Sequence, residues 1–368
     1  MYGNFFLIFN NKMKNNKTVA IAGDWIYHQY EKSFSIALKE LGYQIIQVKL
    51  SKYFKGKTGA ISSLIPIPSF TMLRINQDIK RIAFSKKPSI FIFWKCVHLF
   101  PSTIEFVNRL KIKTISYNND DPFRHRFSKY SKWYDYFHWY WYTKCLKKYN
   151  YNFFYRNINK IEAKKYYGVS HAKILMPYFL PWNNKPVELN SQDKKKYNCD
   201  IVFVGHFEPD SRVDYLKALI KLGIKVKLFG SSKQWTKKVL GENLYRYFYP
   251  INKAEGEDYN KALNGAKICL ALLSKLNRDT YTRRCFEIPA CGSLMLAERT
   301  KDLQILYKED YEACFFSNID ELLFKVKWLL TNEHLLNDIA LNGYNKVIRD
   351  KHDVKNRAIE LIKEIKQI

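Results

Sequence analysis

The feature that most constrains this chain is an alternation of short apolar runs with helical segments, which occurs twice. Short runs rich in β-branched and aromatic residues predict buried strands, and apolar residues three or four apart predict helices. Strands that alternate with helices predict a mostly parallel sheet with helices on both faces. We therefore expect an α/β fold.

The alternation stops once, at the polar stretch WNNKPVELNSQDKKKY, and then starts again. The expected domains are a first at 1–183, a linker at 184–197 and a second at 198–368. The expected strands are 18–23, 43–50, 89–94, 113–117, 152–157 and 173–179, then 199–205, 225–230, 245–251, 267–273 and 293–298. The expected helices are 29–41, 102–110, 159–168, 211–222 and 256–265, a helix that begins with Arg283 and Arg284 in its first turn, and a run of helices to residue 368. Two Rossmann-like domains should result, with ligands in the cleft at the carboxyl ends of the strands.

The chain is strongly basic, because 62 Lys and Arg against 34 Asp and Glu give a net charge of +28. Such a charge indicates either an anionic binding partner or a bias in composition. The possible partners are nucleic acid, an anionic membrane surface and a polyanionic substrate. A chain this rich in Lys, Asn and Ile can also be basic for compositional reasons alone. The seven cysteines lack metal-like spacing, and no apolar run approaches the roughly 18 residues of a membrane span. The sequence thus predicts a cytoplasmic protein, which the charge could bring to the inner face of a membrane.

Several common motifs are missing. The GKT at 56–58 lacks the first glycine of a phosphate-binding loop, and no G-x-G-x-x-G follows an opening strand. No two aspartates lie two residues apart, and no histidine pair has metal-ligand spacing. We therefore expect no cofactor and no obligatory metal.

One segment, TRRCFEIPACGSLMLAERTKDL (282–303), resembles the C-terminal domain of CgeB-like glycosyltransferases, a family named for a spore-maturation protein. SYNNDDPF (116–123), VFVGHFEPDSR (202–212) and LNGYNKV (341–347) are similar to other parts of that family. The resemblance implies a GT-B fold, in which two facing Rossmann-like domains bind a nucleotide-sugar mainly through the second.

Arg283 and Arg284 at a helix start require an anion, because the N-terminus of a helix disfavours cations. A nucleotide diphosphate would supply it, and Glu287 one turn later could accept hydrogen bonds from the ribose diol. Alternatively, Arg283 and Glu287 form only an i, i+4 ion pair. Asp279 lies eight residues before Glu287, a spacing that resembles the acid pair of retaining GT-B enzymes, or it merely caps the helix.

Further donor-binding candidates follow two expected strands of the second domain. Gly205 would let a phosphate approach the backbone, and His206 and Arg212 would add charge. Asn277 follows the strand at 267–273. For His206 and Asn277, ordinary surface polarity is the competing explanation.

In the first domain, Asp120 and Asp121 follow the strand at 113–117 and are candidates for the base that activates an acceptor hydroxyl. The alternative is an Asp-Pro turn. The aromatic stretch at 132–157 suits core packing, a membrane interface or sugar stacking.

The expected function is transfer of a sugar from a nucleotide-diphosphate donor to a glycan, a lipid-linked or a protein acceptor, such as one used in a cell-surface glycan. Donor base, donor sugar and stereochemistry stay open. One alternative is a basic nucleic-acid-binding protein or a transferase that acts on DNA. Another is an inactive GT-B scaffold in surface assembly.

Overall fold

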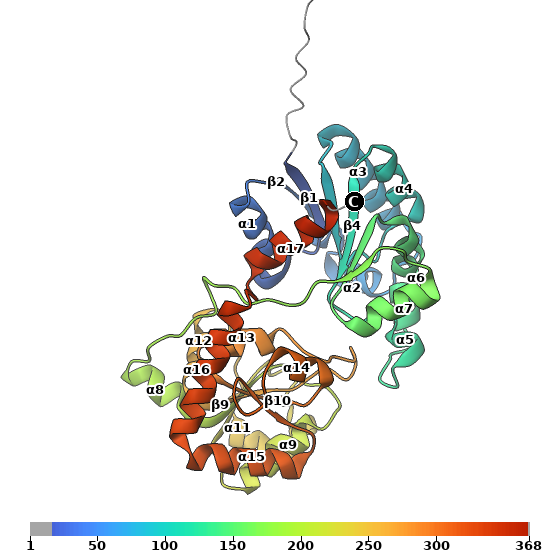
Figure 1. Cartoon of the computed structure of the whole chain (residues 1–368). Coiled ribbons are helices and arrows are strands. Elements are labelled where there is room, and N and C mark those ends of the chain that lie inside the picture. The colour runs from blue at the N-terminus through green and yellow to red at the C-terminus, as the bar shows by residue number, and fades with distance from the viewer. Residues whose placement is uncertain (1–16, 367–368) are drawn as a thin grey trace, which may run out of the picture.

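Two parallel sheets organise the structure, a computed structural model that describes residues 17–366. Figure 1 shows them in separate lobes, one built from the first half of the chain and one mainly from the second. The strand order is β2-β1-β3-β4-β5-β6 in the first sheet and β11-β10-β9-β7-β8 in the second. The expected α/β class is confirmed.

The first sheet consists of β1 (Thr18–Gly23), β2 (Gln44–Lys49), β3 (Ile90–Trp94), β4 (Lys113–Asn118), β5 (Tyr151–Phe154) and β6 (Ala172–Ile174). Its helices are η1 (His28–Lys32), α1 (Ser33–Glu40), η2 (Ser51–Tyr53), α2 (Gly56–Leu64), α3 (Phe70–Lys86), α4 (Pro101–Arg109), α5 (Arg124–Phe127), α6 (Asp135–Cys145), η3 (Leu146–Lys148) and α7 (Asn157–Tyr167).

The second sheet consists of β7 (Cys199–Val204), β8 (Val226–Phe229), β9 (Ala266–Ala271), β10 (Leu294–Glu298) and β11 (Cys314–Phe316). The helices of this half are α8 (Ser191–Tyr197), α9 (Arg212–Lys221), α10 (Lys237–Leu240), α11 (Glu242–Phe248), α12 (Glu257–Asn264), α13 (Arg284–Ala290), α14 (Lys301–Leu306), α15 (Ile319–Thr331), α16 (Glu333–Arg349) and α17 (Val354–Lys366).

Both faces of each sheet are covered, which explains why the strands are almost uniformly apolar. In β1, Val19 and Ile21 pack with α1 and α17, whereas Ala20 and Ala22 pack with α3 on the opposite face. In the second sheet, α9 and α15 cover one face and α12 and α13 the other. The parallel strands therefore all direct their carboxyl ends to one edge, and the two edges face each other.

The chain crosses between the lobes twice. After the first crossing it builds the second sheet, and after α16 it returns so that α17 packs against α1 and the first sheet (Figure 1). At the return, the backbone N–H of Phe179 donates to the carbonyl of His352 and that of Val354 donates to the carbonyl of Phe179. The predicted range 198–368 thus ends in a helix of the first core, and the predicted linker contains α8.

Two sequence-based expectations differ from the structure. The expected strand at 245–251 is wrong, because most of it lies in α11, where Leu244 and Phe248, four residues apart, are buried. The alternative in which Asp279 caps the helix after β9 is wrong, because that helix begins at Arg284 with Arg283 at the N-cap position and no capping side chain among the described residues.

Among residues 17–366, no helix has the length and apolarity that crossing a membrane requires. All seven cysteines are buried free thiols.

Candidate functional site

A cavity of about 300 Å³ lies between the two domains, where the carboxyl ends of both sheets meet. This is the edge at which α/β sheets bind ligands. The first domain contributes residues from η1 and from the ends of β3, β4 and β5, whereas the second contributes the segments after β7 and β9 and the start of α13. Of the predicted site residues, those that line the cavity are Asp120, His206, Arg212, Asn277, Asp279, Arg283, Arg284 and Glu287.

The two arginines bring positive charge to the cavity wall, and each has one nitrogen without a hydrogen-bond partner among the described residues. Arg283 donates from Nε to Glu287 Oε1 (2.7 Å), and Arg284 donates from Nη2 to the carbonyl of Leu272 (3.1 Å). Neither Nη1 of Arg283 nor Nε of Arg284, both buried, has a hydrogen-bond partner within residues 17–366. Both guanidinium groups belong to residues of the cavity wall, and Arg284 is bonded there to a carbonyl rather than to a carboxylate, so this end of the cavity carries positive charge that favours an anion.

Glu287 is held from two sides. Its exposed fraction is 3%, and besides the Arg283 pair it accepts a hydrogen bond from the Tyr259 hydroxyl (2.9 Å) at Oε2. The competing ion pair considered from the sequence is therefore present. A carboxylate has about four acceptor sites, so two remain for a ligand.

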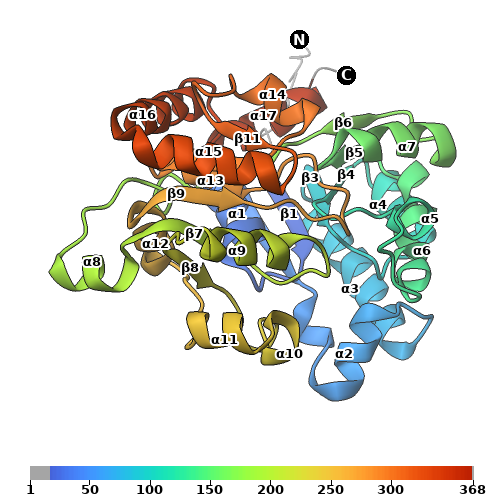
Figure 2. The ribbon, with the colours of Figure 1, turned by 90° about the horizontal axis from the view of Figure 1, so that it is seen from below.

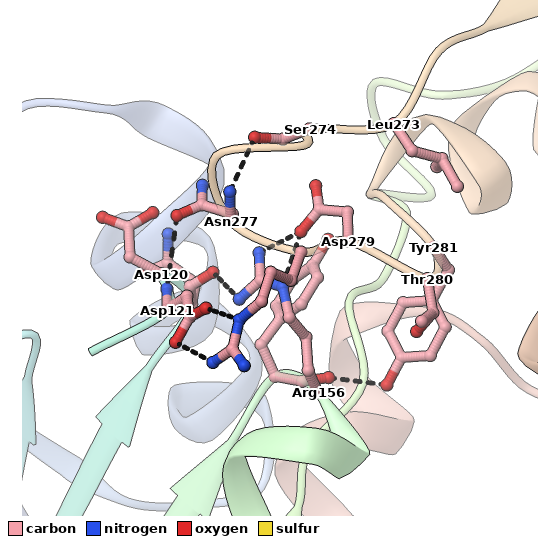
Figure 3. Close-up of polar contacts among 12 residues, drawn as sticks. Asp120, Asp121, Arg156, Leu273, Ser274, Asn277, Asp279, Thr280 and Tyr281 are labelled. Carbon is pink, nitrogen blue, oxygen red and sulfur yellow. Dashed lines mark hydrogen bonds and ion pairs between the residues drawn. The ribbon is translucent and has the colours of Figure 1, made fainter. Parts of the chain in front are cut away.

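Asp279 faces the cavity as part of an ion pair that joins the domains (Figure 3). Arg156 donates from Nε to Asp279 Oδ1 (2.6 Å) and from Nη1 to the carbonyl of Asn119 (3.0 Å). Nearby, the Tyr281 hydroxyl donates to the carbonyl of Tyr155 (2.6 Å). Asp279 is thus fixed in place and is not a helix cap.

Asp120 also lines the cavity, and it pairs with Lys95 from the segment after β3. Burial alone would raise the pKa of Asp120, but the neighbouring Lys95 ammonium outweighs it and lowers that pKa to about 2. The carboxylate is therefore ionised at neutral pH, and it can orient or accept from a ligand hydroxyl.

Asp121 differs from its predicted role, because it is fully buried and is absent from the cavity wall. Arg278 donates to both of its oxygens (2.5 and 2.9 Å), and Asn159 donates to Oδ1 (2.8 Å). Arg278 also donates to both oxygens of Glu162 (2.7 and 2.9 Å). The Asp121 carboxylate thus belongs to the contact between domains.

The segment after β7 is organised by internal contacts. Arg212 is buried, and it donates to Asp210 from Nε (2.7 Å) and to the carbonyl of His206 from Nη1 (2.6 Å). The Nε2 atom of His206 lies 2.8 Å from Glu208 Oε1. Gly205 does not line the cavity, and a Cβ there would lie 2.7 Å from the Phe203 ring. Side-chain packing therefore requires this glycine, whereas its predicted contact with a phosphate stays a prediction.

Asn277 connects the two domains from the segment after β9 (Figure 3). Its Oδ1 accepts from the backbone N–H of Asp121 and from Arg124, each at 3.3 Å, while its own N–H donates to Ser274 Oγ (3.1 Å). Asn277 is thus positioned by the domain contact.

Sequence reasoning missed several residues of the cavity wall: Gln29, Tyr30, Trp94, Tyr117, Arg156, Tyr178 and Glu208. Arg156 lies two residues after β5, but the strand expected at 152–157 includes it, so its position at the end of a strand was hidden. Tyr30 gives no such signal, because it lies in η1 with non-helical backbone angles. Within the described part of the chain, no three His, Cys, Asp or Glu side chains are grouped as metal ligands.

Known structures share this fold. Sucrose-phosphate synthase from Thermosynechococcus elongatus superposes with a TM-score of 0.70 at 11% identity, covering 95% of this chain and 98% of that one. A glycosyltransferase from Rickettsia africae gives 0.68 at 13% identity, with 96% and 98% covered. Anabaena HepE in complex with UDP and glucose gives 0.64 at 10% identity, with 95% and 100% covered.

The architecture is therefore that of the GT-B class, two Rossmann-like domains that enclose a cleft. Residues 212–363 match a family described as glycosyl transferase-like. Together, fold and family match support a glycosyltransferase enzyme. No curated protein matches the sequence. The narrower resemblance to CgeB-like proteins stays a prediction.

Proposed function

We propose that the protein transfers a sugar from a nucleotide-diphosphate donor, held at the start of α13, to an acceptor that enters from the first domain. The positive charge of Arg283 and Arg284 at the cavity wall carries this proposal, because a diphosphate offers acceptor oxygens and negative charge to both. The complex of Anabaena HepE with UDP and glucose supports the donor class.

Glu287 would bind the ribose hydroxyls through the acceptor sites that Arg283 and Tyr259 leave free. Asp279, fixed by Arg156, would face the donor sugar. The leaving diphosphate would be stabilised by the two arginines without an obligatory metal.

The acceptor side would lie along Asp120 and the aromatic side chains Tyr30, Trp94 and Tyr178. Aromatic rings stack on the apolar faces of sugars, and an ionised carboxylate accepts from an acceptor hydroxyl. A glycan, a lipid-linked intermediate or a protein-bound sugar presents both an apolar sugar face and a free hydroxyl.

Calorimetric titration with UDP and with uridine tests the donor site. Arg283→Ala and Arg284→Ala should each weaken UDP binding by about tenfold to a hundredfold, since a charge-assisted contact contributes about 1.5–3 kcal/mol. Uridine binding should change much less, because it lacks the phosphates. Glu287→Gln should weaken both ligands. Arg246→Ala, on the exposed side of α11, is the matched control.

Equal UDP affinity in the wild type and all three variants would contradict the site. If no nucleotide binds, the inactive scaffold is the better description. Tight duplex DNA binding with a steep salt dependence would favour the nucleic-acid alternative.

A further inference from the structure

Large apolar side chains are exposed together on one side of the first domain. They come from α2, the loop that follows it, the start of α3, and the start of α6 with the residues just before it, and their exposed fractions run from 47% to 80%. We call this the α2–α6 surface, and its members are Ile61, Leu64, Ile67, Phe70, Leu73, Trp133, Tyr136 and Phe137. Contiguous exposed apolar side chains on a folded domain mark a contact surface.

Hydrogen bonds hold the parts of this surface side by side. His138 of α6 donates from Nδ1 to the carbonyl of Leu64 (2.8 Å), the final residue of α2. His98, in the segment after β3, donates from Nε2 to the carbonyl of Ser62 (2.9 Å). Figure 2 shows α2, α3 and α6 on the same side of the lobe.

The charge around this surface is mainly positive, although Asp78 of α3 pairs with Lys52 beside it. Residues 51–74 contain no acidic residue, and residues 122–150 contain one, Asp135, which is buried and paired with Arg124. The basic residues of these two segments that are exposed include Lys52, Lys55, Arg74, Arg126, Lys129 and Lys132. The surface thus combines large apolar side chains with surrounding cations.

The same surface is connected to the acceptor side of the cleft through one segment of chain. The segment after β3 that supports α2 through His98 also carries Lys95, the partner of Asp120. Burial lowers the pKa of His138 to about 4, and the charge of Lys95 adds to this effect. The segment after β3 thus connects this surface with Asp120 of the cavity wall.

We propose that the α2–α6 surface docks the protein on an anionic lipid bilayer. Trp, Tyr and Phe side chains prefer the interfacial zone of a bilayer, and nearby lysines are attracted to anionic headgroups. A second copy of the chain fits less well, because protein interfaces are depleted of lysine at their centre and two such basic surfaces would repel each other. The docking does not depend on the proposed transfer reaction.

Vesicle co-sedimentation with the full chain tests the proposal. The probes are vesicles of phosphatidylcholine alone and of phosphatidylcholine mixed equally with phosphatidylglycerol. The double variant Phe70→Ser/Trp133→Ser should reduce partitioning onto the mixed vesicles at least about tenfold. The control Ile305→Ser/Phe324→Ser, with similarly exposed side chains on the second domain, should bind like the wild type.

The cationic contribution is tested in parallel. Lys129→Gln/Lys132→Gln should reduce binding by about fivefold per lysine at low salt, whereas Lys217→Gln/Lys327→Gln, which removes the same charge from the second domain, should have little effect. Thermal unfolding checks that all variants fold.

Three outcomes would overturn the proposal. The first is an equal loss of vesicle binding in Lys129→Gln/Lys132→Gln and in Lys217→Gln/Lys327→Gln, which would mean that binding depends only on the net charge of the protein. The second is unchanged binding in Phe70→Ser/Trp133→Ser. The third is that the wild type is a dimer in sedimentation velocity and Phe70→Ser/Trp133→Ser is a monomer, while both still bind vesicles. UDP affinity, measured separately, should be unchanged in every variant, so failure here leaves the donor site untouched.

Discussion

Gly205 is the first residue after β7, and the ring of the fully buried Phe203 occupies the space that a side chain would need. The Trp235 indole N–H donates to the carbonyl of Gly205 (2.9 Å), which limits how far the backbone can move away. The position therefore combines tight packing with a fixed backbone.

Gly205→Ala should lower the free energy of unfolding by about 1–3 kcal/mol, the usual cost of overpacking a core. Adding Phe203→Leu should recover part of that loss, because the smaller side chain leaves room for the new methyl group. Urea unfolding of the two single variants and the double variant measures the coupling. A stable Gly205→Ala protein with weakened UDP binding would instead support the phosphate role predicted from the sequence.

Asp120 provides a pH-dependent test. Its pKa is about 2 in the folded protein and 3.8 without the fold, so the ionised form stabilises the folded state above about pH 4. This contribution, about 2 kcal/mol, is lost as pH falls from about 4 through 2. The wild type should therefore exceed Asp120→Asn in stability at pH 6, and the difference should shrink below pH 4. A difference that stays constant down to pH 2 would show that the pKa is not lowered.

At the scale of elements, α17 completes the first core although it follows the second domain in sequence. Leu361 and Ile365 of this helix are almost fully buried against the first sheet. Its stabilising effect should therefore appear in the first domain.

Leu361→Ala should destabilise the first domain by about 2–5 kcal/mol, the typical cost of a cavity in a core. Hydrogen exchange should accelerate in β1 and β3 and stay slow in β7 and β9. Leu341→Ala, at a side chain that is 56% exposed on α16, is the matched control and should have little effect. Equal acceleration in both sheets would mean that the domains unfold as one unit.

Most strands could be predicted because they are short apolar runs, buried on both faces, between helical segments. The strand expected at 245–251 failed because its aromatic composition favours a strand, while burial of Leu244 and Phe248 follows the helical period. In the site, polar residues after strands were predictable, and Asp120 and Asp279 do face the cavity. Tertiary contacts decided the rest, since only the fold brings Arg278 to Asp121 and Tyr259 to Glu287.

At the scale of the whole molecule, the segment after β9 connects the domains through two sets of ion pairs. Arg278 reaches Asp121 and Glu162 of the first domain, and Arg156 of the first domain reaches Asp279. Because these acids are buried, they require either their partners or water.

Arg278→Met should therefore favour a more open arrangement, in which Asp121 and Glu162 are hydrated. Small-angle scattering should show a larger radius of gyration for Arg278→Met than for the wild type. The control Arg246→Met, at an exposed arginine of α11, should have the same radius of gyration as the wild type. An unchanged radius together with a large loss of stability would mean that the contact supports folding rather than closure.

The return of α17 to the first sheet also fixes the order in which the protein can be finished during synthesis. Residues 199–349 contain all five strands of the second sheet and α16, so the elements of the second core are all translated before α17. The first sheet emerges earlier, but the face that α17 covers stays open until residue 365 is translated and released. The domain encoded first is thus completed by a helix that is translated after the whole second sheet, and a chain truncated before α17 would expose that apolar face to chaperones and proteases.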